Sequence, residues 1–227
     1  MVRQGGLTCG STNIRTSTSS DSRTFGGVGR TDVFEYRSVL AGPAIVAPRV
    51  LLEVGSSSGR EPSVTRSIQS FVSQFLTERD LSMGTANERA FSMRLLHFRR
   101  TFLEKLFAIH SKVELIRERR GKLGSYARHY YDLYQLAGTS EVQAMLRSGE
   151  ADLIRADYDR VSRARFARDY RPPEGLRFAS SPALFPDGEL EQELRSQFEA
   201  QARLLCFGPF PDWREVRARL ELLRDLL

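Results

Sequence analysis

The chain has 227 residues, of which 41% are hydrophobic, so it can bury a substantial core in one domain or two small ones. No window approaches roughly eighteen consecutive apolar residues, and the start lacks the apolar stretch of a signal peptide. We therefore expect a cytoplasmic protein. The net charge of +6 favours contact with polyanions such as nucleic acid, but an arginine-rich solvated surface would have the same composition.

Cysteine and histidine are sparse and widely spaced. Cys9 and Cys206 lie too far apart in the sequence to suggest a disulfide framework or a zinc site. His97, His110 and His129 show no spacing that would place two imidazoles on one helical face. The sequence predicts plain thiols and no histidine-based metal site.

The first half of the chain is predicted to be rich in strands. Residues 1–31 are dominated by Gly, Ser, Thr and Arg and are expected to be flexible. Two strands are predicted at 33–40 and 48–54, separated by glycine and proline. After a loop at 55–62, apolar residues recur every three or four positions over 63–78, which predicts an amphipathic helix. Residues 90–97 alternate apolar and polar side chains, which predicts a third strand.

The second half is predicted to be helical. Phe102, Leu106, Ile109 and Val113 share one helical face. A further helix is expected around Tyr130, and others at 140–147, 151–170, 188–206 and 213–226, the last of them opening with a capping box of Asp212 and Glu215. The predicted class is α+β, with three parts: a flexible segment 1–31, a strand-bearing part 32–99 and a helical domain 100–227.

Two segments contain the residues that are candidates for a functional site. RTFLEKLFAIH at 100–110 places Lys105 within an otherwise apolar helical face, and ARHYYDLYQL at 127–136 surrounds Asp132 with three tyrosines. The choice of lysine is unusual here, because only three of the 34 basic residues are lysines and all three lie between 105 and 122. The two segments resemble two helices of the AbiEii/AbiGii toxin family, which have the forms R-T-F-x-E-K-L-x-x-x-H and A-R-H-Y-Y-D-L-Y-x-L.

The resemblance extends over about residues 36–227. The run from Tyr36 to Ile68 is similar to the family's strand, its L-L-E-x-G segment and the helix that follows, and the tail is similar to its closing pair of helices. It implies a partial polymerase-beta-like nucleotidyltransferase core followed by a helical bundle. It also implies the effector of a type IV toxin–antitoxin pair in phage defence, which moves a nucleotide from an NTP to RNA, for example tRNA, with Mg²⁺. A cognate antitoxin is the implied protein partner.

The resemblance also suggests roles for individual residues. The family's functional lysine and aspartate correspond to Lys105 and Asp132, and a lysine suits phosphate because it offers a point charge on a flexible stem. The alternative is that Lys105 pairs with a surface carboxylate, and that Asp132 pairs with Arg128 on its own helix, a contact worth about 0.5 kcal/mol.

Four further residues are candidates for the site. Glu53, near the end of the second predicted strand, is a candidate additional acid or a plain exposed strand end. Arg100, Arg128 and Tyr131 are candidate substrate-binding residues. Tyrosines at helical spacing are more typical of a core than of base stacking, so we expect Tyr130 and Tyr134 to lie in the core.

One expected module is missing from the sequence. Family members begin with a G-G-T or G-S turn, a helix and a strand carrying D-x-D, which supplies two metal-binding carboxylates. The nearest string here is Gly10 and Ser11 followed by Asp21 and Ser22, so no metal residues are assigned. We therefore expect a truncated or degenerate member that is weak or inactive by itself. The alternatives are an inactive helical module that binds RNA or antitoxin, and a gene fragment without a role.

Overall fold

The computed structural model describes residues 29–36, 47–55, 59–84, 88–119, 121–206 and 208–227. These residues form seven α-helices and two separate two-stranded antiparallel sheets, which confirms the α+β class. The chain divides into two compact units, Met1–Ser58 and Gly59–Leu227, and each is considered by itself. Most of the expected flexible segment, including Gly10 and Asp21, lies outside the described residues.

The first unit contains one β-ribbon. Strand β1 (Gly29–Glu35) pairs with β2 (Arg49–Gly55) in an antiparallel register that sets Thr31 opposite Glu53. Both predicted strands are present, but β1 begins earlier than expected, and residues 37–40 of its predicted range lie outside the described residues. Every residue of β2 is exposed, as expected for a ribbon of two strands, which buries little apolar surface.

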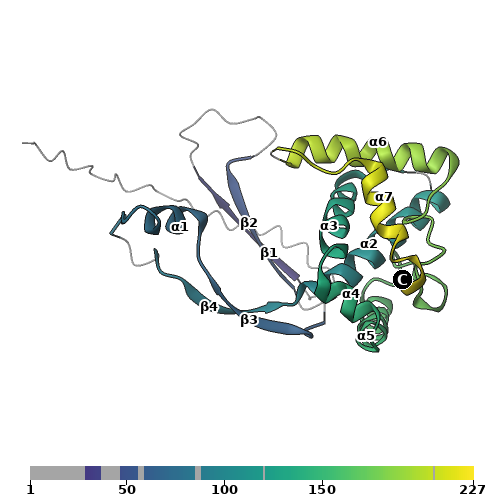
Figure 1. The fold of residues 1–227 in the computed structure, drawn as a ribbon, viewed down its shortest axis with the longest axis horizontal. Helices are drawn as coiled ribbons and strands as arrows, with labels where there is room; N and C mark the ends of the chain where they lie inside the picture. Colours follow the sequence, from purple (N-terminus) through teal and green to yellow (C-terminus); the bar gives the residue numbers. More distant parts are fainter. Residues whose placement is uncertain (1–28, 37–46, 56–58, 85–87, 120, 207) are drawn as a thin grey trace, which may run out of the picture. The chain divides into compact units, whose positions relative to one another are not determined.

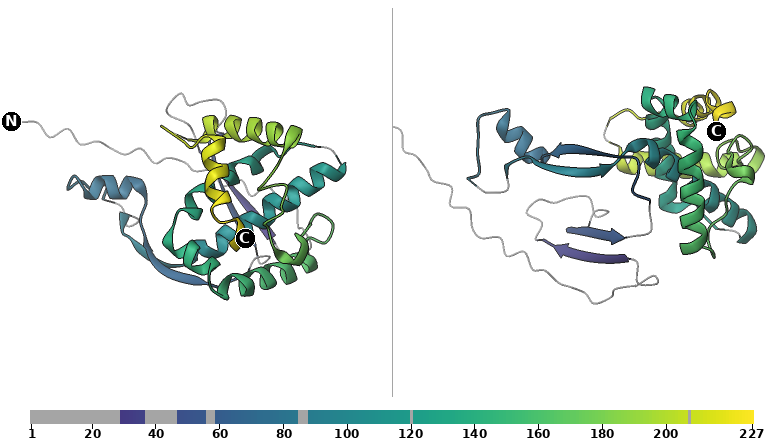
Figure 2. Two further views of the ribbon diagram at one scale, coloured as in Figure 1. Left: turned by 45° about the vertical axis from the view of Figure 1, so that its right-hand side comes forward. Right: turned by 90° about the horizontal axis from the view of Figure 1, so that it is seen from below.

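The second unit begins with a β-ribbon that projects from the helices (Figures 1 and 2). Strand β3 (Ser63–Ile68) pairs antiparallel with β4 (Phe91–Leu96), and α1 (Phe71–Thr77) lies at the distal end of the ribbon. The third predicted strand is confirmed as β4. The helix predicted over 63–78 is wrong in its first half, where the chain is a strand, and right only from Phe71 onward.

Backbone pairing explains this difference. Val64 and Ile68 are spaced as on a helical face, but Val64, Thr65 and Ile68 are β-branched and suit a strand that has a partner. Strand β4 supplies that partner through its ladder of backbone hydrogen bonds. The helix begins only after Ser70, whose hydroxyl accepts a hydrogen bond from the backbone N–H of Ser73 at 3.0 Å.

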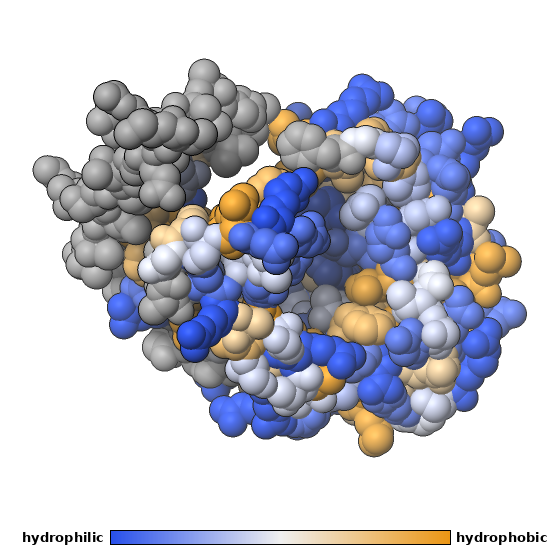
Figure 3. All heavy atoms as spheres, turned by 60° about the vertical axis from the view of Figure 1, so that its left-hand side comes forward, coloured by the Kyte–Doolittle hydropathy of each residue, from blue (hydrophilic) through white to orange (hydrophobic). Residues whose placement is uncertain are grey.

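The ribbon and α1 leave several large apolar side chains exposed. Phe71 is 88% exposed and Phe91 57% exposed. Hydrophilic residues cover much of the face shown in Figure 3, with smaller hydrophobic areas among them. Only Ser73 of α1 is buried, so α1 contributes little to a hydrophobic core.

The helical body follows directly from β4. Helix α2 (Phe98–Arg119) is the longest described helix, and the ring Nδ1 of His97 accepts a hydrogen bond from the backbone N–H of Arg99 at its start, at 3.2 Å. A 3₁₀ turn at Gly124–Arg128 then leads into α3. The remaining helices are α3 (His129–Ala137), α4 (Ser140–Leu146), α5 (Glu150–Arg165), α6 (Gly188–Leu205) and α7 (Trp213–Glu221).

The predicted helices of this body are all present, with ends that differ by a few residues. The last predicted helix, 213–226, is interrupted: α7 ends at Glu221 and a short 3₁₀ turn covers Arg224–Leu226. The start of α7 shows the reciprocal capping box expected from the sequence. The Asp212 side chain accepts from the Glu215 N–H at 2.8 Å, and the Glu215 carboxylate accepts from the Asp212 N–H at 2.7 Å.

Helix α2 lies in the middle of the core and contacts α3, α4 and α5. Its buried face includes Phe102, Leu106, Ile109 and Val113, as the periodicity predicts. Tyr130 of α3 is fully buried, as expected, and its hydroxyl donates to the Ala183 carbonyl at 2.6 Å. Within the described part of the chain, no helix is long and apolar enough to cross a membrane.

A buried histidine makes stability depend on pH. His110 is 5% exposed, and its Nδ1 lies 2.7 Å from the Ser181 hydroxyl. Burial lowers the pKa of His110 below its ordinary value of 6.5, since the charged imidazole is poorly solvated there. Below pH 6.5 the unfolded chain binds this proton more readily than the folded chain. Stability should therefore be fully present above that pH and should decrease as the pH falls below it.

Urea unfolding of wild type and His110→Gln between pH 7 and pH 5 would test this. Between pH 7 and pH 5 the free energy of unfolding should decrease less in the variant than in wild type. Some decrease should remain in the variant, because burial also lowers the pKa of His97. An equal decrease in both proteins would contradict a role for His110.

Candidate functional site

The structure brings Lys105 and Asp132 together. Lys105 lies on α2 and Asp132 in the first turn of α3, and these helices pack side by side in the core. The Lys105 Nζ lies 2.8 Å from the Asp132 Oδ2, and both side chains are partly exposed. Lys105 thus pairs with a partly exposed carboxylate, as one alternative proposed, but that carboxylate is Asp132 itself. The pair between Asp132 and Arg128 that the same alternative proposed does not occur among the described contacts.

His129 completes this cluster and was not predicted from the sequence. Its Nδ1 lies 3.2 Å from the Lys105 Nζ and 3.3 Å from the Asp132 Oδ2. The available signal was its position three residues before Asp132, which places both side chains on the same face of a helix. We refer to Lys105, His129 and Asp132 as the polar cluster.

The electrostatics of the polar cluster favour an ionised carboxylate. Burial by itself would raise the pKa of Asp132, but the hydrogen bonds from His129 and Lys105 and the positive charge of Lys105 outweigh this effect and lower that pKa. Asp132 therefore keeps its negative charge near neutral pH and holds the Lys105 ammonium in a defined position. An ammonium that is fixed beside an accessible surface can bind an incoming phosphate oxygen.

A small cavity adjoins the polar cluster. It has a volume of about 190 Å³ and is lined by Arg128, Tyr131 and Asp132 on one side and by residues of α6, among them Phe198 and Gln201, on the other. Three of the residues singled out in the sequence therefore share one cavity. Its volume is below the roughly 300–1,000 Å³ typical of sites that enclose a whole small ligand, so it can hold only part of a nucleotide.

Arg100 lies elsewhere and is buried. Its side chain is 2% exposed, with the Nε 2.8 Å from Glu104 Oε1 and the Nη2 2.8 Å from Asp157 Oδ2. The Nη1 donates to the backbone carbonyl of Glu61 at 2.8 Å. These contacts connect α2, α5 and the chain before β3 and leave the guanidinium inaccessible to a substrate.

Glu53 belongs to the first unit. It is an exposed residue of β2, opposite Thr31 of β1. The polar cluster belongs to the second unit, so the role of Glu53 in the site stays a prediction.

The described residues do not form a recognisable magnesium site. No group of three or more carboxylate, histidine or cysteine side chains is arranged to hold a metal ion within the part of the chain that the structure describes. A D-x-D string does occur at Asp157–Asp159, but on helix α5, where residues two apart point in different directions. Asp157 pairs with Arg160 and Arg100, and Asp159 pairs with Arg163. Both carboxylates are therefore engaged in ion pairs with arginines and are not arranged as metal ligands.

Comparisons with known proteins bear on this geometry. Neither a curated protein nor a solved structure matches the chain significantly. The family model described as nucleotidyl transferase AbiEii toxin, type IV TA system, matches residues 10–220, and its match begins well before the segment at Tyr36 where the resemblance was first apparent. The matched range contains the polar cluster and the cavity beside it. The chain therefore belongs to the AbiEii family of nucleotidyl transferase toxins of type IV toxin–antitoxin systems.

Proposed function

We propose that the protein transfers a nucleotide from an NTP to RNA, and that the Lys105 ammonium binds a phosphate of the reacting nucleotide. In this transfer an RNA hydroxyl oxygen forms a bond to the α-phosphorus, the bond from that phosphorus to the bridging oxygen breaks, and pyrophosphate leaves. The hydroxyl proton passes to solvent. The observation that carries the proposal is the 2.8 Å pair between Lys105 and Asp132 at the edge of a cavity, in a chain of this family.

The polar cluster suits this task because it positions a cation without burying it. Asp132 restricts the Lys105 side chain, which would otherwise lose much rotamer entropy on binding phosphate. Arg128 is exposed beside the same cavity and supplies a second cation for a phosphate or for the RNA backbone. Tyr131 offers a partly exposed ring against which a base can stack.

Membership of a type IV toxin–antitoxin family implies an antitoxin as the partner of this protein. We propose RNA, tRNA included, as the acceptor because transfer needs a hydroxyl and the chain carries a net charge of +6 that favours a polyanion. This preference should appear as a steep loss of RNA binding with increasing salt.

Labelling of RNA by the purified chain tests the proposal. Because the sequence lacks the D-x-D strand motif, we expect only weak labelling of RNA when the purified chain is given an NTP labelled at the α-phosphate, Mg²⁺ and total tRNA. Lys105→Gln should lower this labelling at least about 100-fold, because a cation at the transferring phosphate is lost. Lys122→Gln is the matched control, since Lys122 is an exposed lysine outside the polar cluster and the cavity, and it should keep wild-type labelling.

Two results would contradict the proposal. If the folded wild-type chain gives no label with any of the four NTPs, the alternative is favoured, namely a catalytically inactive module that binds RNA or antitoxin. If Lys105→Gln labels RNA as well as wild type does, the transfer takes place without the assigned phosphate contact.

A further inference from the structure

A second cavity of the second unit lies between α2 and α5 and is lined by other residues than the small cavity beside Asp132. Its volume is about 530 Å³, which is within the range of sites that enclose a small ligand. Its aromatic walls are Tyr126 from the 3₁₀ turn, Tyr158 from α5, and Phe166 and Tyr170 from the segment after α5. We call it the aromatic pocket.

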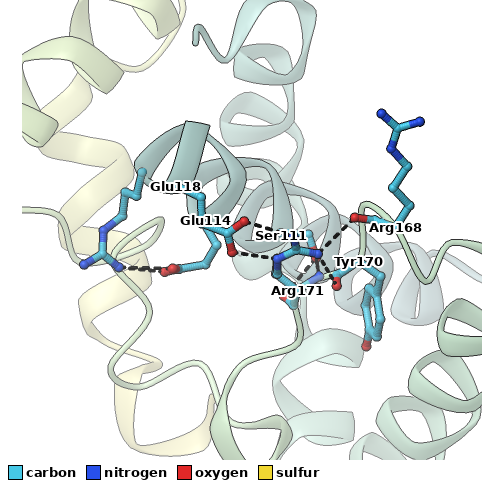
Figure 4. A network of polar contacts seen from close by, with 7 residues as sticks. Ser111, Glu114, Glu118, Arg168, Tyr170 and Arg171 are labelled. Carbon is cyan, nitrogen blue, oxygen red and sulfur yellow. Dashed lines mark hydrogen bonds and ion pairs between the residues drawn. The ribbon is translucent and has the colours of Figure 1, made fainter. Parts of the chain in front are cut away.

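Packing and hydrogen bonds hold the walls of the aromatic pocket in place. The Tyr158 ring stacks on Phe107 of the core with centroids 4.7 Å apart, and the Tyr170 hydroxyl donates to Asp159 at 3.0 Å. Next to Tyr170, Arg171 and Ser111 exchange two hydrogen bonds, of 3.0 and 2.9 Å (Figure 4). These contacts fix the pocket before any ligand enters, which reduces the entropy lost on binding.

The Arg171 guanidinium secures the same wall against α2. It donates two hydrogen bonds to the Glu118 carboxylate, of 2.7 and 2.9 Å, and donates further hydrogen bonds to the backbone carbonyls of Arg168 and Tyr170 (Figure 4). The segment after α5 is thereby held at several points along the end of α2.

Two polar groups in the aromatic pocket indicate what the ligand must carry. The Ser162 hydroxyl is buried and makes no hydrogen bond of good geometry among the described residues. It interacts with the Tyr158 side chain and there opposes the rise in the Tyr158 pKa that burial causes. A buried hydroxyl that is poorly satisfied gains from a ligand atom that completes a hydrogen bond to it. The Lys112 ammonium lies 5.5 Å from the centre of the Tyr126 ring and supplies a cation at the pocket. Asp169 also lines the pocket.

The aromatic pocket adjoins the polar cluster. Lys112 follows Lys105 by seven residues on α2, so the two lysines lie on nearly the same face and about 10 Å apart along the axis. The Tyr126 ring also meets the His129 ring edge to face, with centroids 5.6 Å apart. A ligand with a planar ring among the tyrosines can therefore direct anionic groups along α2 toward Lys105.

We propose that the aromatic pocket binds the base of a nucleotide, with Lys112 contacting its phosphate or ribose and Ser162 a polar atom of the base. This inference rests on the proposed function for the identity of the ligand. The nucleotide can come from two sources: the NTP donor, or the terminal nucleotide of the acceptor RNA. Stacking on aromatic rings tolerates any base, so the pocket itself predicts modest discrimination among the four.

Equilibrium binding to the full chain tests the proposal without any transfer step. The probes are the four NTPs and a single-stranded oligoribonucleotide. We expect Tyr126→Ala to weaken binding by at least about fivefold through loss of stacking, and Lys112→Gln by roughly tenfold through loss of a charged contact. Both side chains can be changed with little risk to folding, because Tyr126 is 40% exposed and Lys112 is partly exposed.

Ser162→Ala separates binding from folding. Removing a buried hydroxyl that lacks a hydrogen bond of good geometry should leave the urea midpoint nearly unchanged or raise it, while ligand binding weakens. A merely structural serine would lower the midpoint and leave binding unchanged. Lys122→Gln serves as the control lysine outside the pocket.

The pattern of losses identifies the source of the nucleotide. Weaker NTP binding in Tyr126→Ala and Lys112→Gln supports the donor, and weaker oligonucleotide binding alone supports the acceptor. If both variants bind all probes as tightly as wild type does, the aromatic pocket is not the site, even where RNA labelling still depends on Lys105. That outcome overturns this inference and leaves the proposed function intact.

Discussion

Replacing Arg100 by methionine is expected to lower the free energy of unfolding by about 3–5 kcal/mol. The side chain is 2% exposed and its guanidinium lies 2.8 Å from carboxylate oxygens of both Glu104 and Asp157. Methionine keeps the apolar stem but leaves the Glu104 carboxylate half-buried without its cation. Burial already raises the pKa of Glu104, against the opposing hydrogen bond from Arg100.

Chemical denaturation at pH 7 measures this loss, and part of it should be recovered at acidic pH, where a protonated Glu104 needs no cation. Arg195→Met is the matched control, because Arg195 is an exposed arginine with a similar pair to Glu199 and should change stability little. A loss no greater than that of the control would show that the buried cation is not needed for folding.

Gly59 provides an independent check on Arg100. A Cβ at Gly59 would overlap the Arg100 guanidinium, so Gly59→Ala must displace that side chain from its carboxylate partners. In the wild-type background the substitution should therefore be strongly destabilising. In an Arg100→Met background it should cost much less, and this non-additivity in a double-mutant cycle is the expected signature. Additive losses would mean that the two residues act separately.

Replacing Phe107 by alanine is the second change with a large expected effect, about 3–5 kcal/mol. Phe107 is fully buried, stacks with Tyr158 at 4.7 Å and meets Phe178 edge to face at 4.8 Å. The alanine variant leaves a cavity that a packed helical core can only partly close. Phe107→Leu retains most of the apolar volume and should cost clearly less.

The Phe107 variants also connect stability with the aromatic pocket. Tyr158 and Tyr170 line that pocket and both contact the Phe107 ring. Under conditions where Phe107→Ala is still folded by circular dichroism, its urea midpoint should be low and its nucleotide binding weakened as well. Equal urea midpoints for the alanine and leucine variants would indicate that the ring is not closely packed.

The sequence alone predicted the helical half of the protein well, for a physical reason. Helices are specified locally: the apolar period of α2 matches its buried face, and the capping box of Asp212 and Glu215 marks the start of α7. A family resemblance and the rarity of lysine indicated Lys105 and Asp132 as site residues. Their spacing in the sequence did not predict the contact between them.

Tertiary structure decided the features that depend on distant partners. Residues 63–68 have an apolar spacing that fits a helix, yet they form β3 because β4, more than twenty residues later, satisfies their backbone groups. Arg100 looked like a substrate contact, but carboxylates on α2 and α5 enclose it. His129 joined the polar cluster only because α3 packs beside α2. Local sequence determines a helix and its buried face, whereas the partner of a strand or of a charge depends on which segments the fold brings together.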